Sequence, residues 1–398
     1  MKNLFSRNHK SQIANHKFLA HPVVRTLLFE RFLLTASATL AFAAVAMGRV
    51  RITEIPRLMD VRLLSLFFVL TVAVELGKAS DLFDRLVAAA IARARTARGL
   101  ALAMIATTGG LSAVLTNDVA LFLVVPFTML FRNVADLDLA PLVVLEVLAA
   151  NLLGAVTPIG NPQNLFLYAR GGFTPGAFLG AQLPLAVVSA VLLAATTAWI
   201  VPRKILPAPA SPSFDVEPVS AVAFFVLLAA EAASLLGALD HIVPLALALV
   251  GLVLLGRRLR EADFSLVLVF AFLFVGVPGL ERGDLYRYLN PERIFGHRAV
   301  GLLFAGALLS QVVSNVPAAL LLAPTAAGPL AFQGLLYGVT AGACGSPVGS
   351  IANLIGAQIY VTEGGTPRSF WRIFLPVSTL FLAILAALAA LWLRLPRR

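Results

Sequence analysis

The sequence has few of the residues that characterise a disulfide-bonded domain or a soluble enzyme. It contains one cysteine, Cys344, and five histidines. A single cysteine excludes an intrachain disulfide framework and a cysteine-based metal cluster. Charged residues make up only 13% of the chain, roughly half of their share in a typical soluble protein. No nucleophile–histidine–acid set and no phosphate-binding loop is recognisable, so the sequence does not predict an enzyme.

What the chain has in abundance is apolar sequence, which makes up 59% of its 398 residues. The apolar residues form long runs, such as residues 32–48 and 374–393. Runs of about 18–20 apolar residues cross the roughly 30 Å of hydrocarbon in a lipid bilayer as helices. The sequence therefore predicts an all-α polytopic membrane protein with about nine spans. The predicted spans are residues 28–48, 62–77, 141–168, 178–201, 219–237, 241–256, 264–280, 332–360 and 370–393.

Positive charge is concentrated outside the predicted spans. The net charge is +11, and many basic residues lie in the tail at residues 1–27 and in short loops near residues 93–98 and 257–260. Basic segments next to spans set membrane topology, so this pattern does not indicate nucleic-acid binding. We read the first apolar run as a retained span rather than a cleaved signal. The prediction is a multi-pass protein of the cell inner (plasma) membrane with a cytoplasmic N-terminus.

Two further apolar segments, residues 99–131 and 299–330, are each interrupted in the middle by polar residues. The first contains LSAVLTNDVALFLVVP and the second contains LSQVVSNVPAALLLAP, so a hydroxyl residue and an asparagine stand at matching places. Each segment is long enough for two half-crossings, and we expect both to form re-entrant helical hairpins. Non-helical backbone at membrane depth is tolerated only beside protein or a water-filled cavity, so both tips are expected to face one or the other.

Two more pairs of motifs follow the same order in the two halves of the chain. SDLFDRL at residues 80–86 resembles GDLYRYL at 283–289, and TPIGNPQNL at 157–165 resembles SPVGSIANL at 346–354. Members of each pair are separated by roughly 200 residues, which indicates an internal duplication.

A proline-rich linker at residues 202–218 divides the first repeat, residues 28–201, from the second, residues 219–398. The span at 219–237 has no counterpart in the first repeat, so the second repeat should run through the membrane in the opposite direction. Such an inverted-topology repeat is typical of secondary transporters.

Proline and glycine in TPIGNPQN and SPVGSIAN predict that two spans break inside the membrane. Proline removes a backbone donor, and glycine permits unusual dihedral angles. A helix that ends inside the membrane exposes backbone groups and a half-dipole that can bind ions. Taken alone, a serine or asparagine in a span stabilises helix packing, and a proline kinks a helix. Because the same types recur in order in both halves, we expect two tips and two breaks to enclose a small polar transport site.

The ionisable residues that stand out at membrane depth are acidic: Asp118 in the first tip, and Glu75, Glu146 and Glu231 in apolar segments. Such residues are costly in the membrane and usually functional. The alternative for Glu75 and Glu231 is that they reach water near an interface. No Lys or Arg lies clearly at the centre of a predicted span. This composition favours a coupling cation, Na⁺ or H⁺, whereas an anionic substrate would depend on amides, hydroxyls and helix N-termini.

The paired motifs resemble those of the ion transporter superfamily. This group includes divalent anion/sodium symporters, citrate-transporter-like permeases, arsenite-efflux permeases and a class of sodium/proton antiporters. The resemblance covers most of residues 28–393 and implies a scaffold part, a transport part that moves as an elevator, and a homodimer. It implies no cofactor, with Na⁺ as the candidate coupling ion. The substrate-binding residues it implies are Thr116, Asn117, Ser314, Asn315, Thr157 and Ser346, and the coupling-ion-binding residues are Asp118, Asn117, Gly160, Asn164, Asn315, Gly349 and Asn353.

Both tips depart from the Ser-Asn-Thr pattern of the anion symporters. The third position is Asp118 in the first tip and Val316 in the second, so a dicarboxylate would lose a hydroxyl and meet a negative charge. The Asn-Asp pair is similar to the arsenite and antiporter branch, whereas the rest of the second motif resembles citrate-transporter-like permeases. The first hypothesis is therefore a secondary active transporter for a small carboxylate or inorganic oxyanion, coupled to Na⁺ or H⁺. The second is a cation/proton antiporter or arsenite efflux permease that uses Asp118.

Overall fold

The computed structural model describes residues 28–92, 94–132, 137–206, 215–283 and 298–395. These residues are helical apart from short connections, and extended backbone pairs only at an isolated bridge between Thr96 and Ile205. The first half contains α2 (Leu28–Ala46), α3 (Ile55–Leu58), α4 (Val61–Ala79), α5 (Leu82–Ala92), α6 (Ala97–Val114), α7 (Asn117–Met129), α9 (Ala140–Leu153), α10 (Pro162–Gly171) and α11 (Pro175–Ile200). The second half contains α12 (Pro218–Leu235), α13 (Ile242–Leu255), α14 (Ser265–Glu281), α17 (Arg298–Val313), α18 (Asn315–Leu322), α19 (Pro329–Gly342), α20 (Ile351–Thr362) and α21 (Pro367–Arg394).

Each of the nine predicted spans coincides, within a few residues at either end, with one of these helices or with an interrupted pair of them. Among the described residues, five helices are long and apolar enough to cross a bilayer alone, or up to six if α4 and α5 count as one bent span. We conclude that this is a multi-pass helical membrane protein, while the number of crossings stays a prediction. The expected amphipathic piece at residues 80–86 coincides with the start of α5, which is bent by 62° from α4. Its predicted counterpart at 283–289 lies almost entirely outside the described residues.

The helices are interrupted at the four predicted places. In the first hairpin α6 ends at Val114 and α7 begins at Asn117, and in the second α17 ends at Val313 and α18 begins at Asn315. Between α9 and α10 lies a short 3₁₀ turn, η4 (Gly154–Val156), and between α19 and α20 lies η7 (Pro347–Gly349). Pro162 is the first residue of α10 and Pro347 is the first residue of η7. At the first position of a helix the missing N–H of proline breaks no helical hydrogen bond.

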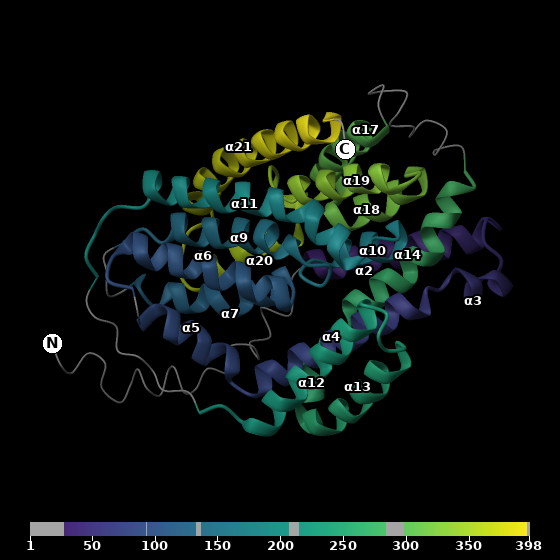
Figure 1. Ribbon diagram of the computed structural model, residues 1–398, viewed down its shortest axis with the longest axis horizontal. Coiled ribbons are helices and arrows are strands. Elements are labelled where there is room, and N and C mark those ends of the chain that lie inside the picture. The colour runs from purple at the N-terminus through teal and green to yellow at the C-terminus, as the bar shows by residue number, and fades with distance from the viewer. Residues whose placement is uncertain (1–27, 93, 133–136, 207–214, 284–297, 396–398) are drawn as a thin grey trace.

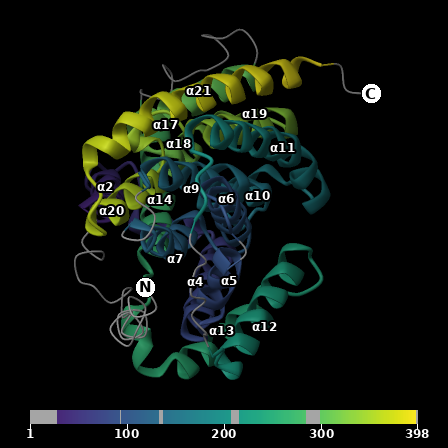
Figure 2. The same cartoon turned by 90° about the vertical axis from the view of Figure 1, so that its left-hand side faces the viewer.

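The helices divide into two groups (Figures 1 and 2). A peripheral group consists of α2, α4, α12, α13 and α14, in which α2 packs along α14 and both α12 and α13 pack along α4. A central group consists of α6, α7, α9, α10, α11 and α17 to α21, in which α6 packs on α9 and α17 packs on α19. Both groups therefore combine helices from the two halves of the chain.

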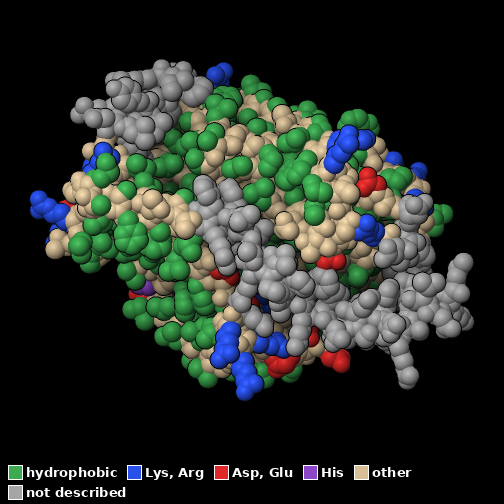
Figure 3. Space-filling view, turned by 180° about the vertical axis from the view of Figure 1, so that it is seen from behind, with side chains coloured by type: hydrophobic (Ala, Val, Ile, Leu, Met, Phe, Trp, Pro, Cys, Tyr) green, Lys and Arg blue, Asp and Glu red, His purple; other side chains and the backbone are tan. Residues whose placement is uncertain are grey.

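The surface of the bundle suits a lipid environment. Large apolar side chains are exposed on α11, α12, α13 and α21, including Val191 at 63%, Val253 at 79% and Leu391 at 61% exposure. Figure 3 shows apolar side chains over much of one face, with Lys and Arg mostly toward its edges. Because water would make such faces unfavourable, lipid is the solvent that explains them. Inside the central group α9 is buried almost completely, so its polar residues face protein on all sides.

Candidate functional site

Each broken helix is fastened to the hairpin of its own half by a hydroxyl residue. In the first half the Thr157 Oγ1 donates to the carbonyl oxygen of Ala113 at 2.5 Å and accepts from the Gly160 amide at 3.1 Å. In the second half the Ser346 Oγ donates to the carbonyl oxygen of Gln311 at 3.1 Å and accepts from the Gly349 amide at 3.1 Å. Both hydroxyls, expected from the resemblance to bind substrate, are therefore engaged in holding the break against the hairpin.

The two predicted break asparagines make the same hydrogen bonds in the two halves. The Asn164 Nδ2 donates to the carbonyl oxygens of Ala155 (3.0 Å) and Thr157 (3.4 Å). The Asn353 Nδ2 donates to those of Ala343 (2.9 Å) and Ser346 (3.2 Å). These carbonyls lie at the interruptions, where a continuous helix would have paired them with its own amides. The side-chain amides of both asparagines therefore supply hydrogen bonds to carbonyl oxygens that the interrupted helices leave without a backbone partner.

Two predicted glycines let the chain turn back on itself at the breaks. A Cβ on Gly160 would collide with the carbonyl oxygen of Gly154, and a Cβ on Gly349 would lie 2.6 Å from the carbonyl oxygen of Gly342. Neither obstacle is a flexible side chain, so only glycine fits without moving backbone. The predicted roles of Gly160 and Gly349 in ion binding stay predictions, whereas their place in the breaks is clear.

A buried chain of three carboxamides joins the first tip to the second break. The Asn117 Nδ2 donates to the Asn151 Oδ1 at 3.1 Å, and the Asn151 Nδ2 donates to the Asn353 Oδ1 at 2.9 Å. The backbone amide of Asn117 also donates to the carbonyl oxygen of Gly160 at 3.0 Å. Exposure is 3% for Asn117 and 0% for the other two asparagines. The structure thus brings Asn117, Gly160 and Asn353 together, and it adds Asn151, which the motifs did not indicate.

The second tip is held differently. Ser314 adopts φ +75° and ψ 157°, whereas its counterpart Thr116 is extended and accepts from the Val119 amide as a helix cap. The Ser314 Oγ donates to the Asn315 Oδ1 at 3.4 Å, and the Asn315 Nδ2 has no partner among the described residues. Both residues are buried, with at most 2% exposure.

A cavity of about 160 Å³ lies between the two helix groups. The peripheral group contributes α2, α4 and the start of α14, while the central group contributes the N-terminal ends of α7, α10 and α20. Thr116 and Asp118 from the first tip line it, together with Pro162 and Ile351, the first residues of α10 and α20. Ser314 and Asn315 are not among its lining residues. The structure therefore opens the first tip to a cavity and leaves the second enclosed.

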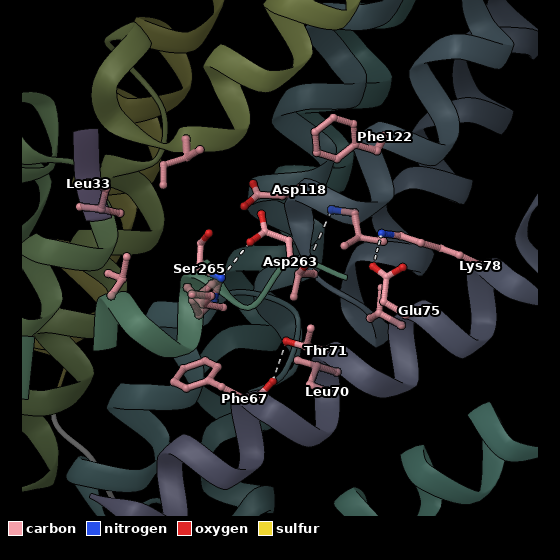
Figure 4. Close-up of a pocket in the computed structure, with 17 residues that line it drawn as sticks. Leu33, Phe67, Leu70, Thr71, Glu75, Lys78, Asp118, Phe122, Asp263 and Ser265 are labelled. Carbon is pink, nitrogen blue, oxygen red and sulfur yellow. Dashed lines mark hydrogen bonds and ion pairs between the residues drawn. The ribbon is translucent and has the colours of Figure 1, made fainter. Parts of the chain in front are cut away.

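Four charged side chains line this cavity (Figure 4). Asp118 and Asp263 point into the same space; Asp263 is exposed and accepts from the Ser265 amide at 2.8 Å. The Asp118 Oδ1 is buried and has no hydrogen-bond partner among the described residues. On α4 the Lys78 Nζ lies 2.7 Å from the Glu75 Oε1. Lys78 and Asp263 were not predicted from the sequence, because Lys78 stands near the end of a predicted span and Asp263 stands outside one.

Two other acids at membrane depth lie outside the cavity. Glu146 on α9 is fully buried, and the Thr128 Oγ1 donates to its Oε1 at 2.6 Å. Glu231 on α12 is 1% exposed, and neither of its carboxyl oxygens has a hydrogen-bond partner among the described residues. The alternative that Glu231 reaches water is therefore wrong for this conformation. In the described part of the chain no group of three His, Cys, Asp or Glu side chains is arranged to hold a metal ion.

Comparison with known proteins identifies the family. The chain is 31% identical to the inner membrane protein YbiR of Escherichia coli, over 78% of this chain and 81% of the relative. It is 32% identical to the uncharacterized transporter MJ0456 of Methanocaldococcus jannaschii, over 64% of this chain and 69% of the relative. A 46 kDa membrane protein of Mycobacterium leprae is 24% identical over 71% of this chain. The profile described as citrate transporter matches residues 26–339. The protein is a membrane transporter that belongs to the citrate transporter family.

Proposed function

We propose that the protein is a secondary active transporter that moves a small anion, a carboxylate or an inorganic oxyanion, coupled to Na⁺ or H⁺. The observation that carries the proposal is the cavity between the two helix groups, which ends at the first tip and at the starts of α10 and α20. A cavity at that place lets a small solute reach the interrupted helices from one side of the membrane. The description of the family as citrate transporters supports a carboxylate.

The cavity offers complementary places for an anion and for a cation. Helix N-termini carry partial positive charge and unpaired amides, and α7, α10 and α20 all begin at or beside the cavity. These amides and Lys78 would attract an anion. The carboxyl groups of Asp118 and Asp263 would attract the coupling Na⁺ or H⁺, which would also reduce their repulsion of the anion.

The paired hydrogen bonds of the two halves support an inverted repeat and alternating access. In that arrangement the central group is the moving part and the peripheral group the scaffold, as in an elevator, with the scaffold pairing in a homodimer. If the N-terminus is cytoplasmic, α4 ends and α14 begins on the cytoplasmic side, so the cavity opens inward. The E. coli relative is named as an inner membrane protein, which supports the same membrane for this chain.

A second candidate function is cation/proton antiport or arsenite efflux through Asp118. The observation that favours it is the balance of charge in the cavity, where Glu75, Asp118 and Asp263 outnumber Lys78. A net negative cavity stabilises cations and repels free anions.

Transport by purified protein in liposomes distinguishes the two functions. We expect labelled citrate, succinate or sulfate to accumulate only when a Na⁺ or pH gradient is imposed, and Asp118→Asn to abolish the dependence on that gradient. If an imposed Na⁺ or pH gradient instead drives counter-movement of cations with no anion present, the antiporter function replaces the anion transporter.

A further inference from the structure

We propose that Asn151 is a positioning residue of the transport site, an inference that rests on the proposed function. Asn151 lies near the end of α9 and is completely buried. Its side chain contacts no substrate in this proposal. It acts through Asn117 and Asn353, by holding the first tip at a fixed distance from the second break.

The hydrogen bonds of Asn151 use both N–H donors and the oxygen of its side-chain amide. The Oδ1 accepts from the Asn117 Nδ2, and the Nδ2 donates both to the Asn353 Oδ1 and to the carbonyl oxygen of Val147 at 3.2 Å. The Asn151 carbonyl oxygen also accepts from the Asn161 Nδ2 at 2.9 Å. One residue thus fixes the first tip, the first break and the second break. Within this network the side-chain amides of Asn117, Asn151 and Asn353 all have partners, and buried hydrogen bonds that are satisfied in this way make a structure rigid and specific.

In the described part of the second half the equivalent bridge is absent. By the spacing between the two broken-helix motifs, the position that matches Asn151 is Thr340 on α19. Its Oγ1 accepts from the Gln182 Nε2 of α11 at 3.1 Å, and among the described residues it makes no bond to the second tip. The two groups that a bridge would join, the Asn315 Nδ2 and the Asn164 Oδ1, both remain without a partner among the described residues.

The contrast extends to the backbone of the tips. The amide of Asn117 donates to the carbonyl oxygen of Gly160, but no corresponding bond from Asn315 to Gly349 forms among the described residues. The first tip is therefore docked by its backbone and by Asn151, while the second tip has neither attachment. Asn151 therefore fixes the first tip to both breaks, whereas the second tip lacks the corresponding attachments.

The test compares Asn151→Ala and Asn151→Asp with the matched control Thr340→Ala. Asn151→Asp keeps the size of the side chain but replaces the donor to Asn353 with an oxygen. An aspartate variant that behaves as wild type would show that the donor to Asn353 is not needed and that Asn151 only fills space. Each variant is first checked for a melting temperature and a gel-filtration profile like those of the parent protein.

The first readout does not depend on transport. Val119 is the third residue of α7, next to the first tip, and lines the cavity. The native Cys344 is buried. In a Val119→Cys, Cys344→Ala background, we expect both Asn151 variants to raise the rate of labelling by a fluorescent maleimide about threefold or more. Thr340→Ala should leave that rate unchanged. Equal rates in the Asn151 and Thr340 variants would overturn the inference whatever the substrate is.

The second readout is uptake of labelled citrate by liposomes. Both Asn151 variants should raise KM about tenfold with Vmax within about threefold of wild type, because a mispositioned tip weakens binding. An unchanged KM would also overturn the inference. If wild-type protein takes up no anion, the proposed function fails, and the labelling rates still decide the role of Asn151.

Discussion

At the scale of single residues, Ser314 and Thr116 occupy matched positions but have different backbone conformations. Ser314 has φ +75° with ψ 157°, a region that is populated almost only by glycine. Thr116 is extended, with φ −150°. Strained residues persist where the surrounding structure imposes them, and they cluster at sites where a ligand or a change of conformation relieves the strain. The second tip is therefore the less relaxed of the two.

We expect Ser314→Gly to leave the melting temperature unchanged or to raise it. Relief of the strained conformation should contribute about 1–3 kcal/mol, which exceeds the roughly 0.5–1 kcal/mol that glycine costs through the unfolded chain. Thr116→Gly is the matched control. It raises the entropy of the unfolded chain in the same way, but it relieves no strained conformation and it removes the side-chain cap on α7. Thermal unfolding of both variants in one detergent measures the difference. Equal losses of stability would show that Ser314 is not strained.

At the scale of helices and turns, the breaks depend on glycines that no other residue can replace. A Cβ at Gly160 would overlap the carbonyl oxygen of Gly154 and approach that of Ser112. Gly110 on α6 is the natural comparison, because a Cβ there meets nothing within 4 Å. The difference between the two sites comes from their surroundings, because Gly110 is exposed on a helix whereas Gly160 is buried against the backbone of the break.

Gly160→Ala should therefore destabilise the folded protein by several kcal/mol, in the range of the largest single-residue effects. Gly110→Ala should be neutral or slightly stabilising, because alanine is the better helix former by up to about 1 kcal/mol. Yield of monodisperse protein and melting temperature in detergent report both effects. A Gly160→Ala protein as stable as Gly110→Ala would mean that the break can be rebuilt without glycine.

The helices and their interruptions could be predicted because their signals are local. Long apolar runs gave the spans, and the proline and glycine of TPIGNPQN and SPVGSIAN gave the breaks. Asn164 and Asn353 could be found because they recur at the same motif position. Asn151 could not, because its counterpart is Thr340 and no repeated pattern marked it. Its importance arises from α7, α9 and α20 meeting in space, which a linear sequence does not display.

The same reason explains why the charges of the cavity were only partly predicted. Asp118 belongs to a recognisable motif, whereas Asp263 lies in a loop and Lys78 lies in the last turn of α4. These two residues approach Asp118 only because the peripheral and central groups pack side by side (Figure 4). An acidic residue inside a predicted span can be recognised from the sequence. The net charge of a site depends on which helices and loops the tertiary structure brings together.

At the scale of the whole molecule, the cavity lies at the boundary between the two helix groups. Its walls come from α2, α4 and α14 on one side and from α7, α10 and α20 on the other. Each group includes helices from both halves, so a movement of one group against the other displaces both tips together. Movement of this kind would close the cavity on one side and open the site on the other, as alternating access requires.

A bulky side chain at this boundary should therefore stop transport without unfolding the protein. Thr71 is half-buried on α4 and lines the cavity, and its Oγ1 donates to the Phe67 carbonyl oxygen of its own helix at 2.9 Å. In Thr71→Trp the indole would occupy part of the cavity of about 160 Å³ and obstruct both the solute and the closure of the two groups. We expect uptake to fall at least tenfold, with a melting temperature close to that of wild type.

The control places the same side chain where the bundle faces lipid. Val253 on α13 is 79% exposed, so Val253→Trp adds the same apolar bulk without touching the cavity. Tryptophan at a lipid-facing position is well tolerated, and this variant should transport and melt as wild type does. Undiminished uptake by Thr71→Trp would show that the solute passes elsewhere and that the two groups need not close at this boundary. Equal loss in both variants would instead point to a general effect of tryptophan on insertion.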